Sequence, residues 1–150
     1  MKSIEVWMSI DPSQNPTLHA EGGEDAMTLD EKQAAVGGLI EYCTFAENVQ
    51  LPVPTDAGMR MATVLNVIAN EEGRLMNLET NQIGTYAAFG VPIGEAPFLI
   101  LGNVLLHVRI DEDAALVTPQ TLMQTVMGIR RSHMIPSLSL AEADYTLGDE

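Results

Sequence analysis

Few residues of this 150-residue chain have the type and spacing that catalysis needs. Cys43 and His107 both lie in predicted strands, where a thiol and an imidazole could face each other as nucleophile and base. A buried thiol and a hydrogen-bonded core histidine explain the same residues more simply. Glu71 and Glu72 are neighbours in a predicted turn, so their side chains point in different directions and suit solvation better than acid–base catalysis. We therefore expect no catalytic residues.

Sites for phosphate, metals and cofactors also lack their usual sequence patterns. A phosphate loop places glycines between a strand and a helix, whereas Gly37-Gly38 lies between a predicted helix and a predicted strand. The three histidines and Cys43 are too isolated to match the paired spacing of zinc ligands. Asp111-Glu112-Asp113 could attract calcium, but the glycine and glutamate of an EF-hand loop are missing downstream. The sequence predicts no metal site and no cofactor.

The charge of the chain favours protein partners over nucleic acid. There are 21 Asp and Glu against 7 Lys and Arg, which gives a formal net charge of −14. Binding to a phosphate backbone depends on clustered cations, so free nucleic acid is a poor candidate partner. An acidic surface instead steers association toward basic protein surfaces. A merely solvated acidic surface, or adaptation to a saline habitat, is the alternative interpretation.

Length and composition indicate one soluble domain. A chain of 150 residues can bury one ordinary core, and hydrophobic residues make up 46% of it, too many for global disorder. Cys43 is the single cysteine, so no intramolecular disulfide forms. The N-terminus lacks the apolar stretch of a secretory signal, and no run approaches the ~20 apolar residues of a membrane span. We expect a cytoplasmic protein without membrane contact.

The strongest structural signal is the apolar run over residues 62–69, whose β-branched residues predict a strand buried on both faces. The following Asn-Glu-Glu-Gly sequence predicts a tight turn, because Gly73 tolerates positive φ and Asn70 can bond its own backbone. Residues 74–76 are expected to return as a short strand. Together these segments predict a hairpin.

A helix and two strands are predicted nearer the N-terminus. Residues 29–36 combine helix formers with acids in the first turn, and Gly37-Gly38 is a natural C-terminal cap. A strand is expected over residues 39–45. The alternation in residues 4–10 predicts a strand with one buried face. Trp7 would lie on its other face, either packed under a loop or exposed as a contact anchor.

Shorter elements complete the prediction. They are loops over residues 11–26 and 46–58, a helix over 78–89, and strands over 97–101 and 104–110. Gly102-Asn103 separates the last two strands, either as a hairpin turn or as a bend within one strand. Thr118-Pro119 is a good opening for a Met-rich helix that suits either core packing or docking to a partner.

These elements predict an α+β fold. We expect a small, mostly antiparallel sheet of about five strands, with the helices over residues 29–36 and 118–133 packed against it. Residues 1–133 should form a single domain. The acidic segment over residues 134–150 is expected to be a loosely ordered tail.

A set of short motifs resembles a small family of domains of unknown function. The motifs are Val36-Gly-Gly-Leu-Ile-Glu41, Asn70-Glu-Glu-Gly-Arg-Leu75, Leu78 with Asn81, and Ile100-Leu-Gly-Asn-Val104. Their order is similar to that of a family scattered through bacteria, phages and plasmids, over residues 27–108. The chain departs from it by an insertion over residues 46–61 and by the residues after Val108. The resemblance implies a compact α+β fold and a mobile-element context, with no activity to transfer.

We therefore expect a non-enzymatic interaction protein of a phage or other mobile element. It would act in the host cytoplasm as an antagonist or modulator of a host protein, for example a basic one, and a homodimer is compatible with this role. The alternative is a binder of a nucleotide-like or sugar ligand, or a minor enzyme, with a pocket near residues 70–73. The candidate binding residues are Asn70, Glu71, Glu72, Arg74, Asn77 and Asn81, and the expected structural turns use Gly37, Gly38, Gly73 and Gly102.

Overall fold

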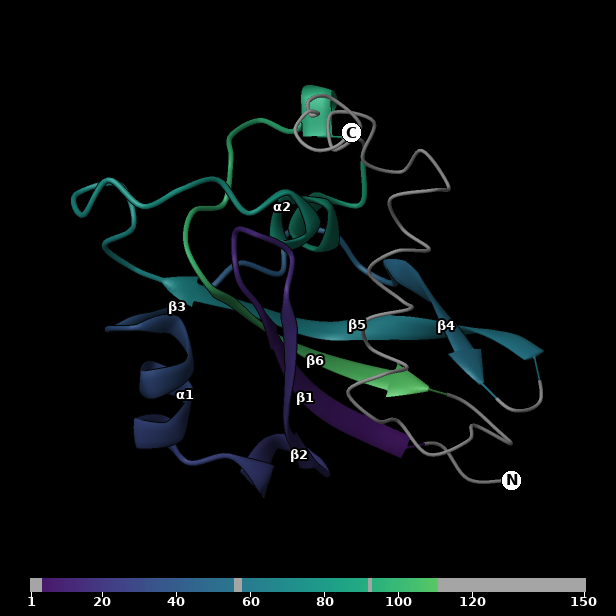
Figure 1. Cartoon of the computed structure of the whole chain (residues 1–150). Helices are drawn as coiled ribbons and strands as arrows, with labels where there is room; N and C mark the ends of the chain where they lie inside the picture. The colour runs from purple at the N-terminus through teal and green to yellow at the C-terminus, as the bar shows by residue number, and fades with distance from the viewer. Residues whose placement is uncertain (1–3, 56–57, 92, 111–150) are drawn as a thin grey trace.

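The computed structural model describes residues 4–55, 58–91 and 93–110 and shows a small α+β fold (Figure 1). Its elements are β1 (Ile4–Ile10), β2 (Pro16–Glu21), η1 (Glu24–Ala26), α1 (Leu29–Val36), β3 (Ile40–Tyr42), β4 (Gln50–Thr55), β5 (Gly58–Asn70), α2 (Gln82–Phe89), η2 (Ile93–Glu95) and β6 (Val104–Ile110). Six strands form one sheet in the order β2-β1-β6-β5-β3, with β4 also paired to β5, and the pairings of these described strands are antiparallel. The predicted fold class is confirmed.

The strand β5 is the longest in the sheet and pairs with three other strands. Its apolar run pairs with β6 along one side, while its other side pairs first with β4, from Gly58 to Thr63, and then with β3, from Ile68 to Asn70. The change of partner coincides with a bulge between Val64 and Asn66, where the register against β6 shifts. As a result, β3 forms the last strand at one edge of the sheet.

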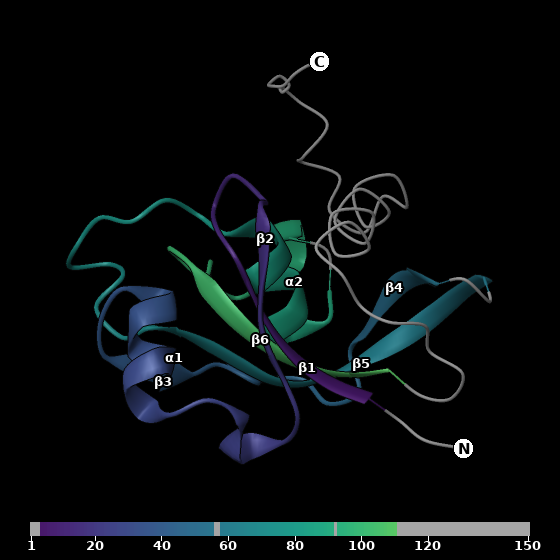
Figure 2. The ribbon, with the colours of Figure 1, turned by 60° about the horizontal axis from the view of Figure 1, so that its bottom comes forward.

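Helices lie on both faces of this sheet. Figures 1 and 2 show α1 and α2 on opposite sides of the strands. The core on the α2 face contains Ile83 and Ala87 of the helix, and the core on the α1 face contains Val36. Burial on both faces explains why the apolar run of β5 has no polar stripe.

Strand β1 is buried on both faces as well. Val6, Met8 and Ile10 belong to the core on the α2 face, whereas Trp7 belongs to the core on the α1 face. The indole Nε1 of Trp7 donates a hydrogen bond to the carbonyl oxygen of Gly23 at 3.0 Å. Of the two interpretations of Trp7, packing beneath a loop is confirmed. The prediction of a single buried face is wrong, because α1 and the loop cover the second face.

Local sequence explains where both helices begin. Thr28 and Glu31 form a reciprocal capping box at the start of α1, and Gly37 ends the helix at φ 82°. The helix predicted over residues 29–36 is therefore confirmed. The helix α2 begins later than predicted, because Asn81 is its N-cap and accepts a hydrogen bond from the backbone N–H of Gly84 at 2.8 Å.

Several predicted elements need correction. The predicted loops over residues 11–26 and 46–58 contain β2 and β4, whose strand structure comes from pairing with β1 and β5 and not from a local apolar pattern. Residues 74–76 form turns instead of a strand, with hydrogen bonds from Met76 N–H to Glu72 O and from Asn77 N–H to Arg74 O.

The region around Gly102 also differs from both predicted alternatives. Residues 97–101 are not a strand apart from a single bridge between Leu101 and Thr80, so Gly102 forms neither a hairpin turn nor a bend within one strand. Gly102 has φ 82°, and a Cβ there would lie 2.7 Å from Leu78 Cδ1. The helix predicted over residues 118–133 and the tail lie outside the described residues. Within the described part of the chain, no helix has the length and apolar character to cross a bilayer.

Candidate functional site

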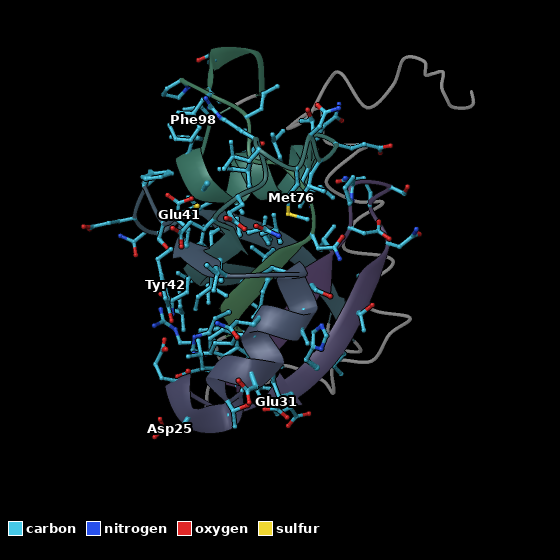
Figure 3. All side chains as sticks on the ribbon, turned by 90° about the vertical axis from the view of Figure 1, so that its left-hand side faces the viewer. Asp25, Glu31, Glu41, Tyr42, Met76 and Phe98 are labelled. Atoms are coloured by element: carbon cyan, nitrogen blue, oxygen red, sulfur yellow. The ribbon has the colours of Figure 1, made fainter. Side chains whose placement is uncertain are left out.

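A groove of about 340 Å³ opens where β3 pairs with the end of β5. It is lined by Glu41, Cys43, Phe45, Ala69, Asn70, Glu71, Gly73, Arg74, Leu75, Phe98, Leu99, Ile100 and Leu101. We call it the β3 groove. Figure 3 views the molecule from this end, with Glu41 and Phe98 of the groove labelled. Three segments that are far apart in the sequence therefore meet at one corner of the sheet.

The groove lies beside the part of the sheet that α2 covers, and no residue of α2 lines it. Cys43 and Ala69 still belong to the core beneath α2 and are 3% exposed, so they form the floor. Beyond them the sheet is flanked by the turn over residues 71–77 and by the loop over residues 97–101.

Aromatic rings form one wall of the β3 groove. Phe45 stacks on Phe89 with ring centres 4.9 Å apart, and Phe98 meets both rings edge-on at 5.6 and 5.1 Å. The offset and edge-on arrangements are the favourable geometries for such rings. Phe45 stays 51% exposed and Phe98 40% exposed, so both rings present an apolar surface to solvent.

Charged side chains complete the lining. Glu41 and Glu71 are exposed, and neither forms an ion pair with another described residue. The guanidinium of Arg74 lies 5.5 Å from the centre of the Phe98 ring, a cation–π contact that joins the turn to the loop. The β3 groove therefore combines an aromatic wall with two carboxylates that have no cationic partner among the described residues.

The structure brings Asn70 and Gly38 together in a packing role. The buried amide of Asn70 donates from Nδ2 to the carbonyl oxygen of Val36 at 3.3 Å, and its Oδ1 accepts from the backbone N–H of Glu72 at 2.8 Å. A Cβ on Gly38 would lie 2.9 Å from that Nδ2. Asn70 thus fixes the turn that carries Glu71 and leaves little hydrogen-bonding capacity for a ligand.

The other candidate residues are dispersed around the turn. Gly73 and Arg74 line the β3 groove, whereas Glu72 and Asn77 are exposed on the turn outside its lining. Asn77 has φ 56°, a turn conformation that asparagine tolerates. A second hollow of about 270 Å³ lies beside the same turn and is lined by Pro12, Val36, Gly37, Asn70, Met76, Leu78, Glu79, Gly102 and Asn103.

Asn81 lines neither hollow and connects three segments of the core. Its side chain is fully buried, and Nδ2 donates to the carbonyl oxygens of Ile10 at 2.7 Å and Gly102 at 2.9 Å. Together with the cap bond to Gly84, these contacts satisfy its amide. We therefore assign the Asn81 side chain to stabilisation of the fold and not to ligand binding.

Cys43 and His107 do not form the pair considered from the sequence. Cys43 belongs to the core on the α2 face, whereas His107 stacks on Trp7 with ring centres 4.1 Å apart on the other face. Burial, with a contribution from Glu41, raises the pKa of the Cys43 thiol to about 11. The thiol therefore stays protonated near neutral pH and is a poor nucleophile.

His107 is the hydrogen-bonded core histidine that the sequence favoured, but the partners of its ring were not anticipated. Its Nε2 lies 2.9 Å from Glu5 Oε1, and its Nδ1 lies 3.5 Å from Glu24 Oε2 and 3.3 Å from the Asn66 amide. These partners come from separate segments and share no local pattern. Because His107 is 2% exposed and its ring nitrogens contact these groups, we assign the cluster to the fold.

The described residues hold no metal-binding cluster, because no group of three or more histidine, cysteine or carboxylate side chains among them is arranged to hold a metal ion. Phe45, Phe98 and Glu41 are among the groove residues that sequence reasoning did not select as binding residues. Of these three, only Glu41 carried a signal, as the last residue of the Gly-Gly-Leu-Ile-Glu motif. No family model, curated protein or solved structure matches the chain.

Proposed function

We propose that this chain is a non-enzymatic protein that binds a basic segment of another protein in the β3 groove. The observation that carries this proposal is the combination of exposed apolar side chains with unpaired carboxylates at one corner of the sheet. Leu75 is 86% exposed, and Phe45 and Leu99 are also large exposed apolar residues of the groove. Contiguous exposed apolar surface of this kind is typical of interaction sites.

Electrostatics supports a basic partner. Glu41 and Glu71 lie in the groove without a cation from the described residues, and the whole chain has a net charge of −14. An approaching lysine or arginine would meet two carboxylates and the faces of two phenylalanine rings, which all favour a cation. Charge attraction over longer range would speed the encounter, and salt would weaken it.

The finer part of the proposal concerns biological context. The motif resemblance over residues 27–108 supports a phage or other mobile element as the source and a host protein as the target. The protein would then act in the host cytoplasm as an antagonist or modulator of that target. This context rests on the resemblance, whereas the basic character of the partner rests on the groove.

A charge-reversal experiment tests the proposal. The tagged protein would be used to capture proteins from a lysate of the source cell, beside a Glu41→Lys, Glu71→Lys double variant. The matched control is Glu21→Lys with Asp25→Lys, which changes net charge equally at exposed positions outside the groove. Figure 3 shows Asp25 at the opposite end of the molecule from Phe98. We expect the groove variant to lose the captured protein and the control variant to retain it.

A second candidate function is the binding of a small ligand. The β3 groove has about 340 Å³, within the usual range of about 300–1,000 Å³ for ligand pockets. Phe45 and Phe98 could stack on a sugar or base, and Glu41 and Glu71 could accept hydrogen bonds from its hydroxyl groups. The same carboxylates would repel phosphate, so an uncharged sugar or nucleoside fits better than a nucleotide. Mass spectrometry of small molecules that co-purify with the protein would detect such a ligand.

A further inference from the structure

We propose that the partner segment binds in extended conformation, as an additional strand on the outer edge of β3, and places a lysine or arginine side chain in the β3 groove. This inference rests on the proposed function and specifies how the basic partner is held. Strand addition gains affinity from main-chain hydrogen bonds and specificity from alternate side chains. At this corner of the sheet, the outer edge of β3 offers main-chain groups for hydrogen bonds, and the β3 groove can receive a side chain.

The hydrogen bonds between β3 and β5 show which backbone groups face outward. Leu39 O accepts from Glu71 N–H at 2.8 Å, and Cys43 N–H donates to Val67 O at 2.7 Å. In an antiparallel pair these groups alternate, so the N–H and C=O groups of Ile40 and Tyr42 point away from β5. No described strand pairs with β3 on that side. The edge therefore presents free donors and acceptors.

The other free edges of the sheet are less suited to a partner strand. Pro52 and Pro54 in β4 lack the N–H groups that pairing requires. The strand β2 begins at Pro16 and pairs with β1 through an irregular register between Trp7 and Met8. No proline or bulge protects β3. Leu39, just before the strand, is 52% exposed, and Tyr42, its last residue, is 48% exposed.

The short length of β3 explains why the β3 groove is needed. Three residues offer a partner only a few main-chain hydrogen bonds, each of which raises the affinity by a factor of about five. Specific binding then requires side-chain contacts beside the edge. Glu41 and Cys43 both line the groove, so this side of β3 is the one on which a long side chain of the added strand would reach the carboxylates.

The arrangement specifies the chemistry of the occupant. Side chains of the added strand alternate between the two faces of the sheet. On the groove side, a lysine or arginine would lie between Glu41 and Glu71, and the aliphatic stem of a second basic residue two positions away would contact Phe45. On the opposite side, apolar residues would contact the exposed ring of Tyr42. The fitting segment is therefore a basic strand with apolar residues at alternate positions and no proline.

Synthetic peptides test this inference directly. The probe is a peptide of alternating valine and lysine about ten residues long, with binding measured by calorimetry on the full chain. A peptide of the same composition, ordered with helical periodicity, and a valine–glutamate peptide serve as controls. We expect the alternating basic peptide to bind and both controls to bind at least about tenfold more weakly. Equal binding of the helical-order peptide, or no binding of the alternating peptide, would overturn the inference.

Backbone modification distinguishes strand addition from side-chain binding alone. N-methylation of every second residue removes the amides on one edge of the peptide, and methylation of the other residues removes those on its opposite edge. An added strand uses one edge, so one methylated peptide should bind and the other should lose binding by about tenfold or more. If both methylated peptides bind like the parent, the segment does not pair with β3.

Protein variants give an independent measure. Tyr42→Pro removes the outward N–H of β3, whereas Tyr42→Ala removes the ring and keeps the N–H. We expect about tenfold weaker peptide binding in the proline variant than in the alanine variant. Hydrogen exchange of the wild-type protein is the second readout: the peptide should slow exchange of the Ile40 and Tyr42 amides, even if the proline variant fails to fold. Unchanged exchange in the bound state would contradict strand addition.

The basic-partner function and strand addition to β3 can be disproved separately. If the captured partner depends on Glu41 and Glu71 but protects neither Ile40 nor Tyr42 from exchange, the basic-partner function holds and strand addition is wrong. If the captured partner is indifferent to charge reversal of both glutamates, the proposed function itself is wrong.

Discussion

The guanidinium of Arg74 lies 5.5 Å from the centre of the Phe98 ring and so joins the two walls of the β3 groove. Arg74 belongs to the turn that follows β5, whereas Phe98 belongs to the loop that precedes β6. The contact uses the one cation among the lining residues for stacking on an aromatic ring. Glu41 and Glu71 are left available to a cation from outside.

Removal of the Phe98 ring should weaken partner binding and should also weaken the fold. Phe98→Ala opens one wall of the groove, and we expect about tenfold weaker partner binding in calorimetry. The ring is 40% exposed and packs edge-on against Phe45 and Phe89, so the free energy of unfolding should also fall, by about 1–2 kcal/mol. Leu29→Ala is the control, because Leu29 is 57% exposed on α1 and outside the groove lining. Equal losses of binding in both variants would contradict the role of Phe98.

Cys43 should be nearly inert toward alkylation in the folded protein. With a thiol pKa of about 11, its thiolate fraction at pH 8 is roughly a hundredfold below that of an unfolded cysteine with the ordinary value of 9.0. We expect iodoacetamide labelling, followed by mass spectrometry, to be slower by at least that factor. A bound peptide should slow it further, because Cys43 lies on the groove floor. Rapid labelling of the native protein would contradict this environment.

The same raised pKa predicts a loss of stability in alkali. Between about pH 9 and pH 11 the unfolded chain releases the thiol proton while the folded chain keeps it, so the unfolded state becomes favoured as pH rises. Denaturant unfolding at several pH values should show this decline for the wild type. The contribution should be absent in Cys43→Ala, whose stability must be compared with its own value at pH 8.

Asn81 should be a major determinant of stability. Asn81→Ala removes the N-cap of α2 and leaves the carbonyl oxygens of Ile10 and Gly102 without their donor. We expect a loss of about 3 kcal/mol in the free energy of unfolding by urea. The exposed Asn103, whose amide makes one long bond of 3.4 Å to Ala35 O, is the control, and Asn103→Ala should cost less than about 0.5 kcal/mol. Similar losses in both variants would refute the assignment.

The close approach of Gly38 to Asn70 should also be measurable. A Cβ at position 38 would lie 2.9 Å from Asn70 Nδ2, so Gly38→Ala must displace the amide that fixes the turn. We expect a loss of about 1–2 kcal/mol in thermal or urea unfolding. A Cβ on Gly94 would meet no described atom within 4 Å, and Gly94→Ala should change stability by less than about 0.5 kcal/mol. If Gly38→Ala leaves the free energy of unfolding unchanged, the turn must accommodate the added methyl group.

Sequence reasoning succeeded where the signal is local. The helix α1 has its capping box and its terminal glycine within ten residues of sequence. The strand β1 has an alternating pattern, and β5 and β6 have long apolar runs. It failed where structure depends on a distant partner. The strand β2 has few large apolar residues and forms because β1 pairs with it, and the segment around Leu101 receives only a single bridge from Thr80.

The candidate site was also predictable only where its sequence signal is local. The Asn-Glu-Glu-Gly turn is recognisable in the sequence, and Glu71 and Arg74 do line the groove. Phe45 and Phe98 are ordinary single aromatics in the sequence, and nothing local indicates that they meet at 5.6 Å across the end of α2. Asn81 is a candidate ligand-binding residue by its type, which suits hydrogen bonding. The same hydrogen-bonding capacity makes it a helix cap, and sequence alone does not separate the two uses.

Photo-crosslinking from inside the groove tests the central claim most directly. A benzophenone amino acid would replace Leu99 in one variant and Leu29 in another, both of them large apolar residues exposed on different parts of the surface. After irradiation in a lysate of the source cell, we predict a protein adduct from position 99 and not from position 29. Mass spectrometry should map the adduct to a basic segment of that protein, and Glu41→Lys with Glu71→Lys should abolish it. Adducts from position 29 alone, or an adduct at position 99 that is indifferent to the charge reversal, would contradict a basic partner in the β3 groove.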